Sequence, residues 1–284
     1  MKALTGEAVQ LYEARFGFNQ NTHRIAVGEP LGQFYGYITE GLYQVDDFNY
    51  DASTQTYTLK DGVPYHGDKS RIRPGMWKFK NLTGDDNVID ENDKTVIGNA
   101  QPKFYGGLNN SFTYKGFDLS IFLTFSYGNE VLNATKLVTS KVGSLNYNAL
   151  DVMNSSNRWM TINSDGQKVT DPGELAALNA GKTVAAYHDA QQGDNYIHSW
   201  AVEDASYLKL SNVTLGYTFP KNLIARVGLK NLRLYATGNN LLTWTKYSGF
   251  DPEVSTMKSG LTPGVDFGAY PLSRSFIFGL NVAF

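Results

Sequence analysis

Hydrophobic and polar residues alternate along the last eleven residues of the chain, Arg274 to Phe284. From Phe276 onward the even positions carry large apolar side chains up to the final residue, whereas the odd positions are small or polar except for Ile277. A period of two indicates a β-strand with one apolar face. Chain termini usually fray, but a transmembrane β-barrel needs a full-length last strand to pair with its first. The apolar set, which we interpret as a C-terminal barrel-assembly signal, is Phe276, Phe278, Leu280, Val282 and Phe284.

The same alternation predicts further strands before this one. The clearest covers residues 117–127, where every odd position from Phe117 to Tyr127 is large and apolar or aromatic. Its length matches the ~9–11 residues that a tilted strand needs to cross a bilayer. It follows the segment 104–114 after only Lys115-Gly116, a connection typical of a β-hairpin. The predicted strands are 33–44, 104–114, 117–127, 207–219, 232–242 and 274–284, with a weaker piece at 9–18 and a bulge near Ser211.

The connections between these strands alternate in length. Two residues join the first hairpin, and the short segment 220–231, with a helical turn predicted at 223–227, joins two later strands. The other connections are long, at about 46–103, 128–206 and 243–273. Outer-membrane barrels have short periplasmic turns and long extracellular loops, whereas a soluble β-sandwich has no reason to separate its loops in this way. The predicted fold class is therefore all-β, with antiparallel transmembrane β-barrel strands.

Composition narrows the function classes. The chain has 284 residues and a net charge of −2, so it has no electrostatic footprint for nucleic acid. It has no apolar run near the ~20 residues of a membrane helix. Cysteine is absent, which removes disulfides and thiol chemistry. The first seven residues contain no apolar segment and do not form a signal peptide. Aromatic residues make up 13%, which suits interfacial girdles and equally suits a sugar-binding sandwich.

An ordered series of motifs resembles one family over most of residues 28–284. The motifs are GEPLGQFYGY at 28–37, KFKNLTGD at 78–85, TVIGN at 95–99, PKFYGG at 102–107, VEDASYLKLSNVTLGY at 202–217, NLRLY at 231–235, GNNL at 238–241 and GFDPE at 249–253. They resemble the SusC/RagA-type TonB-linked outer-membrane proteins of Bacteroidetes. A single one of these motifs would be weak evidence, but the ordered series is specific.

The resemblance implies a nutrient importer of the bacterial outer membrane. Members of the family have a plug inside a 22-stranded barrel, a segment that contacts TonB, and a SusD-like surface lipoprotein, and they import glycans or peptides. The whole chain, 1–284, would be the C-terminal portion of such a barrel, with about six strands and no plug. About six strands cannot close, so their edges would expose unpaired backbone groups to lipid. We therefore expect a fragment, or one piece of a split barrel that the remaining barrel and plug polypeptide completes.

An Asp-rich segment is the candidate metal site. Hard oxygen ligands crowd into 81–93, as Ca²⁺ requires, and the segment resembles an EF-hand-like loop of the family. It departs from that loop at several positions, and one residue is inserted before Val88. The alternative is a solvated turn, because Asp and Asn favour turns. The candidate ligands of this structural Ca²⁺ are Asn81, Thr83, Asp85, Asp86, Asn87, Asp90 and Asp93.

Aromatic residues in the long connections are candidate contacts for a sugar. The predicted substrate-binding residues are Trp77, Trp159, Trp200 and Trp244, with Tyr187, Tyr196, Tyr247 and Tyr270 as further candidates. The alternative, which has better support, is that these rings form interfacial girdles or pack the loops.

Catalysis has little support in the sequence. The four histidines are scattered singly and have no zinc-site spacing. Adjacent carboxylates such as Asp46-Asp47 point to opposite faces of a strand. Asp171-Pro172 predicts a capped short helix at 175–179 and not a site. The leading interpretation is a non-enzymatic transporter, and the alternative is a soluble extracellular all-β glycan-binding module. A cell-surface glycosidase is a third interpretation, and it requires facing carboxylates in a cleft.

Overall fold

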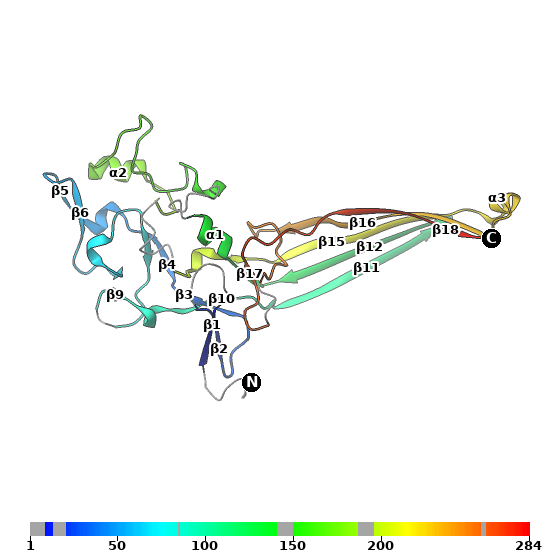
Figure 1. The fold of residues 1–284 in the computed structure, drawn as a ribbon, viewed down its shortest axis with the longest axis horizontal. Helices are drawn as coiled ribbons and strands as arrows, with labels where there is room; N and C mark the ends of the chain where they lie inside the picture. Colours follow the sequence, from blue (N-terminus) through cyan, green and yellow to red (C-terminus); the bar gives the residue numbers. More distant parts are fainter. Residues whose placement is uncertain (1–8, 14–20, 85, 141–149, 187–195, 257–259) are drawn as a thin grey trace. The chain divides into compact units, whose positions relative to one another are not determined.

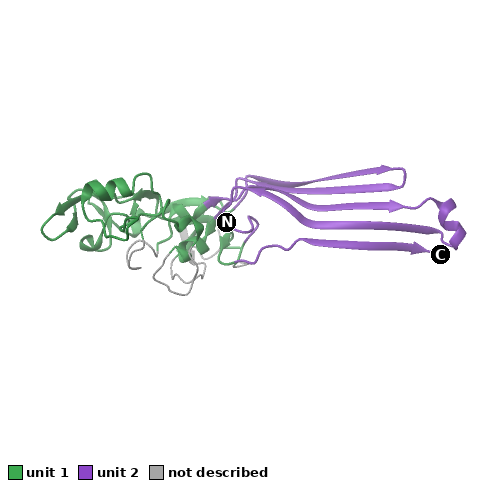
Figure 2. Cartoon of the chain, turned by 90° about the horizontal axis from the view of Figure 1, so that it is seen from above, with its two compact units in different colours: residues 1–100, 132–202, 255–268 green, residues 101–131, 203–254, 269–284 purple. Residues whose placement is uncertain are grey.

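The computed structural model describes residues 9–13, 21–84, 86–140, 150–186, 196–256 and 260–284. The chain divides into two compact units, which are described separately and coloured in Figure 2. Unit 1 comprises residues 1–100, 132–202 and 255–268. Unit 2 comprises residues 101–131, 203–254 and 269–284.

Unit 2 is built on one antiparallel sheet of five long strands in the order β11-β12-β15-β16-β18 (Figure 1). These strands lie at five of the six positions that the alternation predicts. Their bounds are β11 Phe104–Tyr114, β12 Phe117–Tyr127, β15 Tyr207–Thr218, β16 Asn231–Thr245 and β18 Ser275–Ala283.

The two short connections of this sheet have the predicted form. Lys115 and Gly116 both have positive φ, 45° and 88°, as the two central residues of a type I′ hairpin turn require. Between β15 and β16, helix α3 (Lys221–Ile224) and a 3-10 turn at Ala225–Val227 form the predicted helical turn. Gly228, with φ 77°, ends this turn in the left-handed conformation typical of a helix C-terminus.

The bulge predicted near Ser211 is also present. Leu123 of β12 pairs with Leu210, but the next residue, Phe122, pairs with Asn212. Ser211 is therefore an extra residue on β15, and the phase of the strand changes there. The change keeps the large apolar residues of both halves of β15 on the same face of the sheet.

Residues 33–44 do not form the single barrel strand that the sequence predicts. They form β3 (Gln33–Gly36) and β4 (Thr39–Leu42), which belong to different sheets of unit 1. The break lies at Tyr37, whose backbone N–H donates to the carbonyl of Ile197 at 2.9 Å. A Cβ on Gly36 would lie 2.3 Å from the same carbonyl oxygen, so this approach requires glycine. A long-range contact therefore overrides the local alternation.

The other strands are short. The first sheet has the order β1-β2-β3-β10, and β1 pairs antiparallel with β2. Of the weaker piece predicted at 9–18, β1 covers 9–13, and 14–18 lies outside the described residues. The bounds are β1 Val9–Glu13, β2 Asn21–Ala26, β5 Phe48–Asp51, β6 Thr56–Leu59, β7 Tyr65–His66, β8 Trp77–Phe79, β9 Val88–Ile89, β10 Thr95–Asn99, β13 Glu130–Asn133, β14 Val202–Asp204 and β17 Val265–Asp266.

Short helices complete unit 1. Helix α1 spans Ala134–Thr139, and α2 spans Pro172–Leu178. The Asp171 carboxylate caps α2 by accepting from the N–H groups of Gly173 and Glu174, at 2.9 and 3.0 Å. The 3-10 turns lie at Val45–Asp47, Lys69–Arg71, Glu91–Asp93, Asp151–Met153 and Ser199–Ala201. Among the described residues, no helix combines the length and apolar character needed to cross a membrane.

The segments of unit 1 have their own cores. One cluster packs Tyr37, Trp77, Phe79 and Trp159 together, and another packs Phe34 with Leu132 and neighbouring aliphatic side chains. A third gathers Tyr43, Phe48, Leu59, Ile72 and Met76. The parts of the long connections that lie in unit 1 are therefore folded structure and not featureless loops.

Candidate functional site

The five-stranded sheet of unit 2 has one apolar and one polar face. The register places directly opposed residues on the same face, so each cross-strand row can be assigned to a side. One row, for example, runs Phe112–Leu119–Leu215–Ala236–Phe278. Many large residues of this face are exposed, among them Phe104, Leu108, Phe112, Leu208, Leu215, Leu234, Leu242, Phe276, Phe278 and Leu280.

Tyrosine and tryptophan occur on the apolar face only in its end rows. Tyr114 and Tyr217 lie at the end with the short connections, and Tyr127 and Trp244 lie at the other end. The rows between them carry Phe, Leu, Ile and Val, with Ala236, Gly238 and Asn110 as exceptions. From Phe117 to Tyr127, the rows span about 33 Å at ~3.3 Å per residue. A tilt of about 45° projects this length to about 23 Å, close to the ~25 Å apolar band of outer-membrane barrels.

The opposite face is polar, and its side chains bond across the strands. Thr214 lies 2.8 Å from Thr237 between their hydroxyl oxygens, and Asn212 Nδ2 donates to Asn239 Oδ1 at 2.7 Å. Thr124 and the bulge residue Ser211 are joined at 2.6 Å. Polar side chains on neighbouring strands therefore satisfy one another's hydrogen-bonding groups.

One ion pair on the polar face crosses an intervening strand. Arg233 Nε of β16 donates to Asp118 Oδ1 of β12 at 2.9 Å, and β15 lies between them. Gly216 of β15 makes room, because a Cβ there would lie 2.5 Å from both Arg233 Nη2 and Asp118 Oδ1. Sequence reasoning missed this pair, although Asp118 and Arg233 stand out as charges within strands and Gly216 as a glycine between them.

A folded-back segment covers part of the same face. Glu253 accepts from the Tyr207 hydroxyl at 2.7 Å and forms an ion pair with the buried Lys209. Tyr247 is buried in a small cluster with Val131 and Ala205. Tyr247, a predicted substrate contact, is therefore a packing residue.

The strands that carry the C-terminal signal and the first hairpin form the edges of the sheet. Within the described residues, β18 pairs only with β16, and β11 pairs only with β12. The apolar parity of β18 is exposed, from 38% for Val282 to 81% for Phe278. Phe284, the last residue, is 80% exposed. An unpaired strand edge is a template for further strands.

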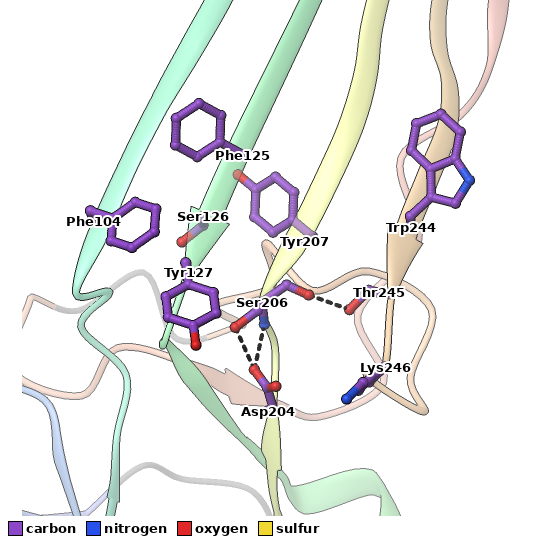
Figure 3. Close-up of a pocket in the computed structure, with 10 residues that line it drawn as sticks. All are labelled: Phe104, Phe125, Ser126, Tyr127, Asp204, Ser206, Tyr207, Trp244, Thr245 and Lys246. Carbon is purple, nitrogen blue, oxygen red and sulfur yellow. Dashed lines mark hydrogen bonds between the residues drawn. The ribbon is translucent and has the colours of Figure 1, made fainter.

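A cavity of about 530 Å³ lies at the Trp244 end of the sheet (Figure 3). Four strands contribute its aromatic part, and the rings of Phe104 and Tyr127 stack there at 5.0 Å between centroids. Its polar part includes Asp204, whose carboxylate accepts from the Ser206 hydroxyl and backbone N–H. The cavity is lined by Phe104, Phe125, Ser126, Tyr127, Asp204, Ser206, Tyr207, Trp244, Thr245 and Lys246.

The predicted calcium ligands are largely bonded within their own loop. The buried Asp93 carboxylate accepts from the backbone N–H groups of Leu82, Thr83 and Asp90 at 2.6, 2.9 and 2.8 Å. Burial alone would raise the pKa of Asp93, but these backbone bonds outweigh it and lower the pKa below its ordinary value. Asp90 caps the following 3-10 turn by accepting from Asn92 N at 2.7 Å.

The other predicted ligands lie on the surface of this loop. Asn81 donates to the Asp86 carbonyl at 2.7 Å, and Asn87 and Thr83 are exposed. Asp85 lies outside the described residues. Within the described residues, no group of three or more His, Asp or Glu side chains is placed to hold a metal ion. These residues therefore do not show a fit to Ca²⁺, and the calcium site stays a prediction.

Two of the four predicted substrate-binding tryptophans are core residues. Trp159 and Trp77 are 1% and 4% exposed, so their faces contact protein and not an external sugar. The prediction is wrong for both, and the reason is that they fill the core of unit 1. Trp200 is half-buried, tilted against Trp77 at 4.9 Å, with Lys136 Nζ 4.1 Å from its ring. Trp244 is 52% exposed and lines the cavity.

The tyrosines predicted to contact substrate also differ in how far their rings are exposed. Tyr196 is half-buried against Tyr37 and Phe79. Tyr270 is 92% exposed, and Tyr187 lies outside the described residues. Among these tyrosines, only Tyr270 presents its ring fully to the surroundings in the described part of the chain.

Curated relatives of the chain are TonB-dependent receptors. TonB-dependent receptor P3 of Formosa agariphila is 33% identical over 270 residues, which cover 93% of this chain and 23% of the relative. TonB-dependent receptor P39 of the same organism is 31% identical and covers 94% of this chain and 26% of its own length. TonB-dependent receptor SusC of Bacteroides thetaiotaomicron is 29% identical, and the match covers 69% of this chain and 17% of SusC.

Solved structures show the same fold. The RagAB peptide transporter has a TM-score of 0.63 and 21% identity, and the match covers 99% of this chain and 25% of that chain. The RagAB peptide importer in its open-open state has a TM-score of 0.64 and 20% identity. That match covers 100% of this chain and 25% of the RagAB chain. No family model matches the chain.

These comparisons agree with the two-faced sheet. The chain belongs with the TonB-dependent receptors, and it is similar to SusC in sequence and to part of RagAB in fold. It spans about a quarter of the length of the curated relatives with which it shares over 30% identity.

Proposed function

We propose that unit 2 forms part of the wall of an outer-membrane importer, with lipid on its apolar face and the transport lumen on its polar face. The observation that carries this proposal is the exposed apolar face bounded by Tyr and Trp rows. Phe278, for example, is 81% exposed; such exposure of an apolar side chain is unfavourable in water but favourable in the hydrocarbon of a bilayer. The cross-bonded polar face suits a wet interior.

The finer part of the proposal concerns the whole transporter. We propose that this transporter takes up glycans or peptides in a TonB-dependent way, with a SusD-like surface lipoprotein as its partner. The name of the RagAB structure specifies peptide transport, and SusC is itself a TonB-dependent receptor. We assign contact with TonB to other parts of the transporter, contact with the lipoprotein and substrate to the long segments, and the open edges of β11 and β18 to further barrel strands.

Single-cysteine labelling tests the orientation of the faces, because the chain contains no cysteine of its own. Phe112→Cys and Ser111→Cys place thiols on opposite faces of β11. In lipid vesicles, we expect a water-soluble maleimide to modify Ser111→Cys, and a bilayer-dissolved maleimide to modify Phe112→Cys. Equal reaction of both thiols with the water-soluble reagent, together with solubility of the chain without detergent, would instead support a soluble glycan-binding module.

A second test addresses cargo. In the complete transporter, we expect replacement of lumen-facing Arg233 or Asp118 to change uptake of a labelled oligosaccharide or peptide more than replacement of lipid-facing Leu234. Uptake that is equally sensitive to both faces would contradict the assignment of the polar face to the lumen.

A further inference from the structure

The cavity at the Trp244 end is amphiphilic, and most of its aromatic residues belong to the apolar face. The register puts Phe125 and Trp244 on that face, in one row with Leu208. Phe104 and Tyr127 pair directly with each other on the same side. Continuing the alternation by one residue places Ser206 and Lys246 there too, next to this row. Four of the five aromatic lining residues are therefore continuous with the exposed apolar face of the sheet, whereas Tyr207 lies in a row of the polar face with Ser126 and Thr245.

The cation at this cavity is the ammonium group of Lys246. Lys246 is exposed, and it has no hydrogen bond or ion pair within the described part of the chain. Asp204 accepts from Ser206 N at 2.9 Å and from the Ser206 hydroxyl, and these bonds, with a smaller contribution from the charge of Lys246, lower the pKa of Asp204. The two charged groups attract each other, but no hydrogen bond or ion pair joins them in the described part of the chain. The ammonium group can thus donate to an external anion. Figure 3 shows Lys246 beside Asp204 and below Trp244.

We propose that this cavity binds the phosphate headgroup of a membrane lipid. Lys246 holds the phosphate, and Trp244, Phe125 and Tyr127 flank the start of the acyl chains, which continue along Leu208 and its row. A cation just beyond an aromatic row meets the depth at which phosphates lie in a bilayer. The occupant is a lipid and not a soluble anion, because the lining below Lys246 is aromatic and leads onto the apolar face. This inference rests on the proposed orientation of the sheet.

Quenching of tryptophan fluorescence by brominated lipids tests the proposal on the full chain in detergent micelles. The probes are dibrominated phosphatidic acid and dibrominated diacylglycerol, which differ only in the phosphate. We expect phosphatidic acid to reach half-maximal quenching at about a fivefold lower mole fraction, the effect of one well-placed lysine. Trp244→Phe should remove most of this signal, since Trp77 and Trp159 are buried.

A matched pair of variants isolates the lysine. Lys246→Ala should abolish the preference for phosphatidic acid, and Lys246→Arg should keep it. Lys230→Ala, an equal charge change at an exposed residue beside the other end of the sheet, should leave it unchanged. Both positions are exposed, so the fold should persist in all three variants. Equal preference in Lys246→Ala and Lys230→Ala would overturn the proposal.

Competition separates the possible sources of the ligand. Inorganic phosphate or maltose that displaced the brominated lipid at equimolar concentration would show a soluble-anion or sugar pocket, and would also overturn the proposal. If the proposed orientation of the sheet is wrong, the experiment gives a different result. If the apolar face does not meet lipid, neither brominated lipid quenches Trp244, whereas failure of the headgroup site alone leaves both lipids quenching equally.

Discussion

Trp159 in unit 1 is 1% exposed, whereas Phe278 in unit 2 is 81% exposed. This contrast holds across the two units: the aromatic and aliphatic residues of unit 1 pack against each other in several clusters, and those of the five-stranded sheet mostly face outward. Both units obey the same hydrophobic effect. The difference teaches that burial alone organises unit 1, whereas the sheet exposes its apolar side chains, as expected if that face meets hydrocarbon in the orientation we propose.

Truncating Trp159 should give the largest effect, and only on unit 1. Trp159→Ala removes a ring that lies against Gly75, where a Cβ would come within 2.3 Å of it. We expect a loss of about 3–5 kcal/mol in the free energy of unfolding, as for other buried large-to-small changes. Chemical denaturation followed by near-ultraviolet circular dichroism measures it. Trp244→Ala is the control, and a loss of similar size there would break the comparison between the units.

Placing a charge on each face of the sheet should give the next largest effect. Leu108 is 54% exposed near the middle of β11, so Leu108→Arg would be nearly neutral if that face met water. In lipid vesicles, we expect it to cost about 2–4 kcal/mol. Asn109→Arg, one residue on and on the polar face, should cost much less. Urea unfolding in vesicles compares the two variants, and equal costs would contradict the assignment of faces.

The pH dependence of unit 1 should come partly from His23. Its Nε2 lies 2.9 Å from the Pro263 carbonyl oxygen, which can only accept, so Nε2 carries the proton. Burial lowers the pKa of His23 to about 4, against the opposing effect of that hydrogen bond. The unfolded chain therefore binds a proton at higher pH than the folded chain. Stability is full above about pH 6.5 and falls by the order of 3 kcal/mol as pH drops to about 4.

Fluorescence can follow this loss in unit 1 alone. In a Trp244→Phe background, all remaining tryptophans belong to unit 1. His23→Gln should flatten the decrease in the unfolding midpoint between pH 6.5 and 4. An unchanged pH slope in that variant would show that other groups carry the dependence.

The smallest effect should come from the ion pair that crosses β15. Gly216→Ala places a Cβ 2.5 Å from Asp118 Oδ1 and Arg233 Nη2, so the two groups must separate. Both side chains are partly exposed, so we expect a cost of about 1 kcal/mol. Urea unfolding of Gly216→Ala in the wild-type and Arg233→Met backgrounds measures it. A cost that persists undiminished without the arginine would point to backbone strain and not to the pair.

The sequence predicted more of unit 2 than of unit 1. Period-two alternation located five long strands, the Lys115-Gly116 turn and the bulge at Ser211, because each depends on neighbouring residues along the chain. The split of residues 33–44 depends on Ile197, and the burial of Trp77 and Trp159 depends on a core assembled from distant segments. The pair of Asp118 and Arg233 likewise needs the strand order, which local pattern does not contain.

The bulge at Ser211 has a consequence for assembly. Alternation alone would tolerate sliding a strand by two residues, because every side chain would still face its proper side. The register of β15 shifts at Ser211 against both of its neighbours, between Phe122 and Leu123 of β12 and between Leu242 and Asn239 of β16. A slip of either strand would leave these irregularities facing regular backbone. The extra residue thus fixes the register in which β12, β15 and β16 pair during assembly.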